Sequence, residues 1–383
     1  MNRLIKWLLI VYLFLSLLPI TAQEEQTSPL LFTAQGTIYV WENGITTQLT
    51  SHDGYSYNPI ISPDGTQFAY RTWSQMTVDY SNKRESFEWR GQVPTDIMIY
   101  DFNTGESAPI TSQPNFANPD TLENGVRHSA PQWSPDGTML TWLASMPDDG
   151  DNMTFELVVY DIVTATSTII ATNLLSEPFA DEPFDVYWGE NGIYTSYVQY
   201  AEDDMIQETY LLFSPSGETR YEVIFMTPIG EFPSFTSFVA QDGEREVFTV
   251  YYGNDTMRLI DETGNVEEII GGIPQIYNQQ SPDSIANVQM SFVGERFSFY
   301  ITNPNSQLQE LLAENQPMGW GLEVVQVAPD GVSVAVLMLG DGIITIWNNG
   351  EITIIERPID DNGNKNHISR IEWGNQRIRI LRG

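Results

Sequence analysis

The sequence predicts an all-β fold, a seven-bladed β-propeller of four-stranded antiparallel blades whose N- and C-terminal strands close one blade. Three features support this fold: a recurring turn, a second hairpin after each copy, and complementary half-units at the two chain ends. The turn reads Ser-Pro-Asp-Gly at 62–65 and 134–137, and Ala-Pro-Asp-Gly at 328–331. Pro fixes the first corner of a turn, and Asp and Gly tolerate the tight bend after it. A repeat period of about 50 residues is typical of propellers.

Looser copies of the turn occupy the intervals between these three. They lie at 189–192, 241–243, 293–295 and 374–376. Each copy separates two short apolar runs, as Trp133 and Met139 do around the second turn. Every copy therefore predicts a hairpin, the first of its unit.

A second hairpin follows in most units, built from β-branched and aromatic residues around Asn, Gly or Thr turns. The clear copies span 38–49, 97–105, 157–164, 210–217, 257–264 and 343–350, and a degenerate one spans 303–312. Two hairpins per unit give the four strands of a propeller blade. No sustained helical period is present, so the sequence predicts no helix.

The two ends of the chain complement each other. The first hairpin (38–49) is of the second type and the last (368–380) is of the first type. Sharing one blade between them would close the ring and remove an open sheet edge. Seven blades follow if every copy is counted, and six or eight are the alternatives.

Residues 1–22 have the pattern of a signal peptide. Arg3 and Lys6 precede an apolar core from Leu8 to Leu18, and Ala22 offers a small residue for cleavage. The alternative is an uncleaved N-terminal anchor, and no later segment is apolar enough to span a membrane. After a short segment at 23–29, residues 30–383 contain no linker and are expected to form a single propeller domain.

The acidic composition of the chain restricts the classes of molecule that it is expected to bind. The chain has 51 acidic and 17 basic residues, a formal charge of −34, and no Cys. Nucleic acid needs Lys and Arg to neutralise its backbone, and anionic membrane surfaces attract basic segments, so both are disfavoured. The acidic surface is also expected to oppose aggregation, and we expect a monomer.

Two motifs carry a family resemblance. Residues 59–70 read Pro-x-x-Ser-Pro-Asp-Gly-x-x-x-Ala-Tyr, and residues 99–105 read Ile-Tyr-Asp-x-x-Thr-Gly. They resemble the TolB-like, WD-like β-propeller repeats of bacterial envelope proteins. The resemblance implies an exported binding scaffold in the periplasm, the cell envelope or outside the cell. It transfers no catalytic residue, and the chain has no room for the additional α/β domain of TolB.

Long connections are predicted on one face of the propeller. Turns within each hairpin are short, whereas the connections between hairpins and between blades contain every insertion. These insertions span 73–96, 112–130, 144–155, 171–184, 199–208, 271–285 and 356–366. Long loops on a rigid scaffold usually carry recognition, although tolerated sequence drift is the alternative.

The first two insertions bring basic and aromatic residues together. The predicted partner-binding residues are Arg71, Trp73, Arg84, Trp89, Arg90, Arg127 and His128, with Tyr80 and Lys83 beside them. Arg and Trp dominate binding hot spots, and Arg grips carboxylates with two hydrogen bonds. The cluster therefore predicts a site for an acidic or aromatic-bearing protein or peptide. The alternative is internal packing of the insertions.

Catalytic patterns are scarce. The chain has three His residues and no Gly-x-Ser-x-Gly elbow, zinc spacing or phosphate loop, and no cofactor is expected. Calcium is the one metal considered, at Asp148, Asp149 and Asp151 or at Asp360 and Asn362, but neither run has EF-hand spacing. The leading hypothesis is a non-enzymatic exported propeller that binds through its long-loop face. The alternatives are a carbohydrate-active hydrolase or lyase with carboxylates at the central funnel, and a structural envelope component.

Overall fold

The computed structural model describes residues 29–381 with gaps. The gaps are 43, 52–54, 85–92, 147–153, 176–185, 229–234, 243–244, 253–255, 271–274, 282–283, 286, 294–295, 304–307, 318–321, 329–332, 339–342, 349–350, 361–362 and 374–376. For residues 275–327 the backbone alone is described. The predicted signal peptide at 1–22 lies outside the described residues.

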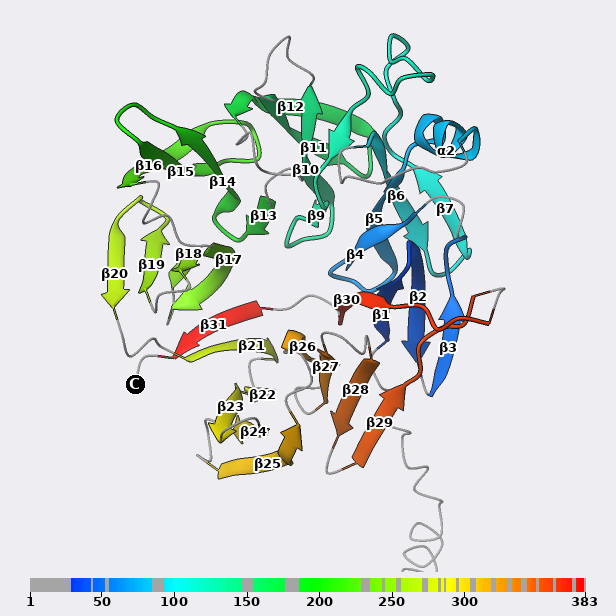
Figure 1. The fold of residues 1–383 in the computed structure, drawn as a ribbon. Coiled ribbons are helices and arrows are strands. Elements are labelled where there is room, and N and C mark those ends of the chain that lie inside the picture. The colour runs from blue at the N-terminus through cyan, green and yellow to red at the C-terminus, as the bar shows by residue number, and fades with distance from the viewer. Residues whose placement is uncertain are drawn as a thin grey trace, which may run out of the picture.

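Strands form most of the described chain and are grouped in seven sheets around a ring (Figure 1). The first complete blade contains β4 (Tyr57–Ile61), β5 (Gln67–Trp73), β6 (Thr95–Asp101) and β7 (Glu106–Pro109). The second contains β8 (Arg127–His128) and β9 (Gln132–Trp133), which both pair with β10 (Met139–Met146), followed by β11 (Thr154–Asp161) and β12 (Thr166–Leu175). The third contains β13 (Val186–Gly189), β14 (Gly192–Tyr200), β15 (Met205–Phe213) and β16 (Thr219–Pro228).

The remaining sheets complete the ring. One sheet contains β17 (Phe235–Asp242), β18 (Arg245–Tyr252), β19 (Thr256–Asp261) and β20 (Val266–Ile270), and it continues through β31 (Arg377–Leu381) to β21 (Gln275–Ser281) and β22 (Ser284–Ile285). The next contains β23 (Asn287–Val293), β24 (Arg296–Asn303) and β25 (Leu308–Pro317), and the one after it β26 (Leu322–Val327), β27 (Val334–Met338), β28 (Ile343–Asn348) and β29 (Glu351–Ile355). The last contains β30 (Ile368–Glu372), β1 (Leu30–Ala34), β2 (Thr37–Glu42) and β3 (Ile45–Gln48). Within the described residues the propeller fold is confirmed. The number of blades stays a prediction, because one sheet has three strands and another continues through β31.

The two ends of the chain close one blade, as predicted. The C-terminal β30 pairs antiparallel with the N-terminal β1, which pairs with β2 (Figure 1). One detail differs from the expectation that the whole hairpin 368–380 enters this blade. Residues Leu30–Ala34 are buried throughout and supply its second strand, so β31 has no place there. Instead β31 pairs parallel with β17 and antiparallel with β21.

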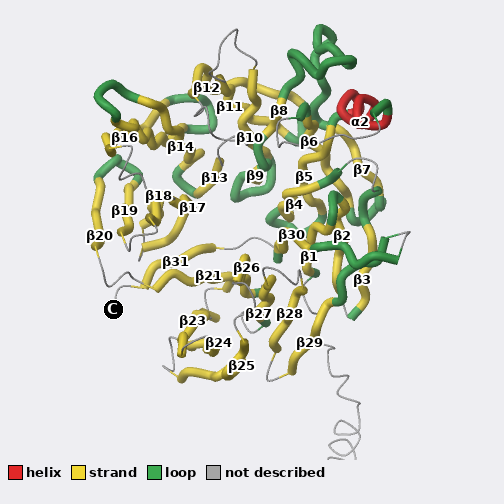
Figure 2. Tube along the Cα trace, in the orientation of Figure 1, coloured by secondary structure: helices red, strands yellow, loops and turns green. Residues whose placement is uncertain are grey.

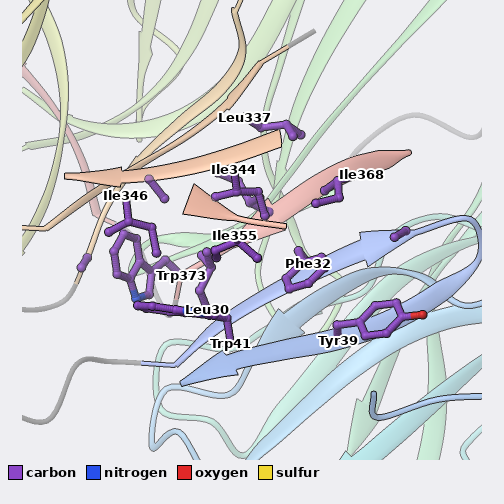
Figure 3. Close-up of a cluster of buried hydrophobic side chains, with 14 residues drawn as sticks. Leu30, Phe32, Tyr39, Trp41, Leu337, Ile344, Ile346, Ile355, Ile368 and Trp373 are labelled. Carbon is purple, nitrogen blue, oxygen red and sulfur yellow. The ribbon is translucent and has the colours of Figure 1, made fainter. Parts of the chain in front are cut away.

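A buried apolar cluster fastens this closure (Figure 3). It combines residues of β1, β2, β27, β28, β29 and β30 with Ala328, directly after β26, and Trp373, directly after β30. The members are Leu30, Phe32, Ala34, Tyr39, Trp41, Ala328, Ala335, Leu337, Ile344, Ile346, Ile355, Ile368, Ile371 and Trp373. The cluster spans two neighbouring blades and both ends of the chain. Its burial therefore stabilises the closed ring rather than one hairpin.

The repeated turns have the predicted chemistry. The Asp64 carboxylate accepts hydrogen bonds from the Ser62 hydroxyl (2.6 Å) and the Thr66 N–H (3.1 Å), and Gly65 has φ +71°. Asp136 makes the same contacts with Ser134 and Thr138. These hydrogen bonds hold the pKa of both carboxyl groups below the usual range. The aspartates are turn formers and show no catalytic arrangement.

Two expectations about the connections need correction. Residues Gln75–Asn82 form a helix, α2, where none was predicted (Figure 2). Ser74 caps it by accepting a hydrogen bond from the Thr77 N–H, which satisfies a free donor of the first turn. The insertions predicted at 144–155, 171–184 and 199–208 are partly strand, since β10, β11, β12, β14 and β15 extend into them. Strands β21 and β22 likewise occupy much of 271–285.

No helix among the described residues has the length and apolar character needed to cross a bilayer.

Candidate functional site

Two long connections meet on one face, beside the blade of β4–β7. The connection from β5 to β6 contains α2, and the connection from β7 to β8 spans 110–126. The Lys83 ammonium lies 3.4 Å from the Asp120 carboxylate, and this contact joins the two connections. Both partners are largely exposed, so this ion pair adds little stability, but it shows that the two segments are neighbours as predicted. We call residues 74–84 together with 110–126 the insertion ridge.

Gln113 holds the base of the second connection. Its side-chain amide donates to the carbonyl oxygens of Thr95 (2.8 Å) and Val126 (3.1 Å), and its carbonyl accepts from the Val126 N–H (2.7 Å). Both ends of the loop are thus tied to β6. The same amide and the Thr111 hydroxyl donate to Asp96, whose pKa is raised because the carboxyl is buried.

The loop above this base is ordered by its own backbone. The Asn118 N–H donates to the Glu123 carbonyl (2.9 Å), and the Leu122 N–H donates to the Asn118 carbonyl (2.8 Å). Leu122 and Asn124 have left-handed φ angles that produce the reversal. The loop displays Phe116, whose side chain is 65% exposed.

The end of α2 displays a cation. The Arg84 guanidinium lies over the Tyr80 ring, 3.9 Å from its centroid, and the residue is exposed. This stacking limits the rotamers of Arg84, and no hydrogen bond from its guanidinium is found within the part of the chain that the structure describes. Arg84 and Phe116 therefore provide a cation and an aromatic ring on the insertion ridge.

Arg71 and Trp73 lie in the interior. Arg71 is 4% exposed; its Nη1 donates to the His128 carbonyl (2.9 Å) in the next blade, and its guanidinium lies over the Tyr57 ring. The Trp73 ring is buried and stacks on Tyr55, with centroids 4.0 Å apart. Both residues pack neighbouring parts of the propeller together.

His128 is also buried. Its backbone N–H donates to the Thr95 hydroxyl (2.9 Å), its Nδ1 contacts the Thr95 carbonyl, and its ring meets Trp142 edge to face. Burial lowers the pKa of His128 to about 4, and the Arg71 charge adds to the effect. The imidazole is therefore neutral at physiological pH and donates from Nδ1.

The neutral state of His128 makes stability depend on pH. An unfolded His binds a proton near pH 6.5, whereas the folded His128 resists it until about pH 4. Acidification through this window therefore favours the unfolded chain, by up to about 3 kcal/mol below the window. We expect His128→Asn, which retains a donor to Thr95, to reduce the loss of unfolding free energy between about pH 7 and about pH 4. Urea unfolding at both pH values measures this, and an identical loss in both proteins would contradict it.

Arg127 differs from these packed residues. It lies at the start of β8 and keeps part of its surface exposed, but its Nη1 is buried and has no hydrogen-bond partner. Burial lowers the pKa of this guanidinium. Among the described residues, no ion pair involving Arg127 is found. Trp89 and Arg90, the other predicted members of the cluster, lie outside the described residues.

The predicted calcium residues give no site in the described part of the chain. Asp148, Asp149, Asp151 and Asn362 lie outside it. Asp360 accepts hydrogen bonds from the Asn364 N–H and side-chain amide, as a turn-forming aspartate does. No group of three or more potential metal ligands occurs among the described residues.

Sequence reasoning missed three residues of this region: Gln113, Phe116 and Tyr55. No pattern marks Gln113, because its role depends on contacts with β6 and Val126 that the linear sequence does not show. Phe116 carried a usable signal, since it is a lone aromatic in a polar stretch that a propeller places on the surface.

No family model matches this chain, and no curated protein matches it. Solved structures do resemble it. A puromycin-hydrolysing peptidase of Mycobacterium tuberculosis has a TM-score of 0.51 and 12% identity, over 89% of this chain and 54% of that one. The sheet arrangement is that of a β-propeller. TolB from Acinetobacter baumannii is itself among the neighbours, at 15% identity over 96% of this chain and 70% of that one (TM-score 0.35). An oligogalacturonate lyase from Vibrio parahaemolyticus matches at 13% identity over 86% of this chain and 84% of that one (TM-score 0.45). At such identities the likeness extends to the fold alone.

Proposed function

We propose that this propeller is an exported, non-enzymatic protein of the bacterial cell envelope that binds a protein or peptide through the face of the insertion ridge. One observation carries the proposal: two separate connections, one before β6 and one after β7, are joined into a single ordered, exposed surface. Gln113 holds its base, and Lys83 and Asp120 join its halves. The pattern of residues 1–22 supports export.

The physical argument concerns the conformational entropy that a loop loses when it binds a partner. A flexible loop loses conformational entropy when it binds, and a loop that is already ordered loses less. Hydrogen bonds at Asn118 and Leu122 fix the loop that displays Phe116, and stacking on Tyr80 restrains Arg84. Aromatic and Arg side chains contribute most to binding hot spots. The insertion ridge therefore combines preorganisation with the residue types that binding uses.

The hydrolase or lyase alternative needs carboxylates near the propeller axis. The first strands of the three successive blades from β4 to β13 contain none: β4 reads YNPII, β8 RH, β9 QW and β13 VYWG. This composition favours binding over acid–base hydrolysis in that part of the ring. The proposed binding role requires no cofactor.

The proposal predicts that Phe116→Asp and Arg84→Glu weaken capture of a native partner without unfolding the propeller. Loss of one hot-spot contact of about 2 kcal/mol corresponds to roughly a 30-fold weaker affinity. The wild-type chain and both variants would be used to capture proteins from the native envelope fraction, and each recovered protein would be titrated against all three.

Val163→Asp is the matched control. Val163 is 85% exposed in the turn between β11 and β12, which lies at the opposite end of the blade from the long connections. We expect this variant to bind as the wild type does, with all melting temperatures unchanged. Equal capture by wild type, both ridge variants and the control would exclude the ridge as the binding surface.

A further inference from the structure

The outer strand of the third complete blade presents a long open edge. Strand β16 ends its sheet in the order β13-β14-β15-β16, and none of the described strands pairs with its far side (Figure 1). It is ten residues long, and its pairing with β15 runs without a slip from Tyr221 to Pro228. Alternate N–H and C=O groups of an edge strand point outward without a partner in the sheet. The edge of β16 can therefore accept a further strand.

The other outer strands are less suited to this. β3 and β7 have four residues each, and β20 and β29 have five. β12 is as long as β16, but its pairing with β11 slips twice between Phe155 and Val158, and the pairing of β25 with β24 also slips twice. Such slips bend a strand and disrupt its ladder. Among the outer strands that the structure describes, β16 has the longest regular edge.

The two faces of β16 differ in their surroundings. Tyr221 belongs to a buried apolar cluster shared with β18, and Val223 and Phe225 pack against that cluster. This face fixes the strand to the next blade. The opposite face carries Ile224 and Met226, which are 49% and 48% exposed. The solvent face of an antiparallel strand usually carries polar residues, so this apolar pair on an open edge marks a surface for contact.

Carboxylates surround the apolar pair. Glu222 is exposed on the same face of β16 as Ile224. The turn at 202–204 reads Glu-Asp-Asp, is exposed throughout, and leads into β15 beside Pro228, the last residue of β16. None of these four carboxylates forms an ion pair with another described residue. A strand added to β16 would lie about 10 Å from β15, two strand spacings away, so its long basic side chains can reach the turn.

We propose that the edge of β16 binds an extended peptide segment of a partner protein by strand addition, and that this segment carries apolar residues flanked by basic residues on one face. The apolar side chains cover Ile224 and Met226, and the basic ones meet Glu222 and the turn at 202–204. In such complexes main-chain hydrogen bonds give affinity and alternate side chains give specificity. The surface belongs to a different blade from the insertion ridge, so this inference goes beyond the function proposed above and does not depend on it.

Charge decides between a basic segment and a second copy of this chain. The net charge of −34 repels identical chains, and charged residues beside an open edge oppose pairing between copies. The same carboxylates attract a segment of opposite charge and fix its register. The edge of β16 is therefore protected against its own kind and complementary to a basic partner.

The probe is a fluorescein-labelled peptide, Lys-Thr-Val-Thr-Val-Thr-Lys, titrated with the full-length protein at low salt and followed by fluorescence anisotropy. We expect Ile224→Lys to weaken binding at least about tenfold, because a lysine on an edge strand opposes further pairing and repels the basic probe. Ile169→Lys is the matched control and should bind as the wild type does. Ile169 is 51% exposed on β12, whose pairing is irregular. A peptide with Glu in place of both Lys residues should not bind.

Charge and backbone pairing are tested separately. Asp203 and Asp204 have left-handed φ angles of 59° and 55°, which Asn also adopts, so changing both to Asn keeps the turn. We expect this double Asn variant to weaken binding about threefold or more, as the loss of exposed charge contacts does. In the probe, N-methylation of the Thr residues blocks one side of the strand and N-methylation of the Val residues blocks the other. Only one of the two methylated probes should lose binding.

Each outcome decides the inference. Absence of binding to the wild type would overturn it, as would equal affinity of wild type and Ile224→Lys or an equal loss in Ile169→Lys. Equal effects of the two methylations would exclude strand addition. If Ile224→Lys fails to fold, wild-type affinity in both Met226→Lys and the double Asn variant overturns the inference.

Two further measurements separate this surface from the alternatives. A dimer in sedimentation velocity that Ile224→Lys dissociates would assign the edge to a second copy and overturn the choice of a basic peptide. Phe116→Asp should retain binding of the probe while it loses the native partner of the insertion ridge. Failure at β16 and failure of the ridge are therefore distinguishable.

Discussion

Deleting residues 368–383 is expected to abolish cooperative folding and leave an aggregating chain. The deletion removes β30, and with it the antiparallel partner of β1. It also removes Trp373, which is 1% exposed in the closing cluster. The open edge of β1 would then be free to pair with other chains. Size-exclusion chromatography and thermal unfolding measure the outcome, and a monomer that unfolds cooperatively would contradict it.

Two milder variants separate the parts of this effect. Trp373→Ala keeps β30 but empties the cluster, and we expect a loss of about 3–5 kcal/mol in the free energy of unfolding. Deleting 374–383 removes β31 alone and leaves the β1–β30 pair intact. This shorter deletion should keep the protein monomeric. If both deletions aggregate equally, β31 and not β30 closes the ring.

Glu246→Ala is expected to cost about 3 kcal/mol or more. The Glu246 side chain, 5% exposed on β18, accepts hydrogen bonds from the N–H groups of Glu190 (2.6 Å) and Asn191 (2.9 Å) and from the Tyr194 hydroxyl (2.8 Å). Removing the carboxylate leaves these donors unsatisfied, at about 1–3 kcal/mol each. The contact joins the blade of β17–β20 to the turn between β13 and β14.

Glu246→Gln tests the mechanism, since an amide keeps one acceptor oxygen and should cost less than Ala. Glu222→Ala, at an exposed position of β16, is the matched control and should cost little. Urea unfolding at neutral pH compares the three. Gly189→Ala should also destabilise, because a Cβ there would lie 2.4 Å from the Glu246 carboxylate oxygen. A loss for Glu246→Ala no larger than for Glu222→Ala would show that the carboxylate is not needed.

The sequence predicted the repeating strands well because two local rules agree along the chain. Alternating or β-branched runs indicate strands. The turns at Asp64 and Asp136 could be predicted because each is held by a local hydrogen bond between the Asp carboxylate and the backbone two residues later. Helix α2 escaped prediction since eight residues give too short a period to recognise, and its start depends on the Ser74 cap. The place of β31 escaped because it depends on Leu30–Ala34 occupying the second strand of the closing blade.

The candidate site was predictable in outline only. Strand order alone indicated that the connections at 73–96 and 112–130 are neighbours, and the contact of Lys83 with Asp120 confirms it. The burial of Arg71 and His128 could not be foreseen. Strand β5 is buried along nearly its whole length, so alternation no longer tells which side chains face water. The charge of Arg71 and the polarity of His128 suggest surface positions, but packing against Tyr57 and Thr95 buries both side chains.

The contacts of Gln113 have an evolutionary consequence. Because one side chain fastens both ends of the loop to the blade, residues 114–125 are insulated from the strands beneath. Such an arrangement lets the loop be exchanged while the scaffold stays the same. The surface of the loop is therefore free to change in evolution without changing the strands, and a foreign loop grafted between Gln113 and Val126 is expected to gain the same anchor.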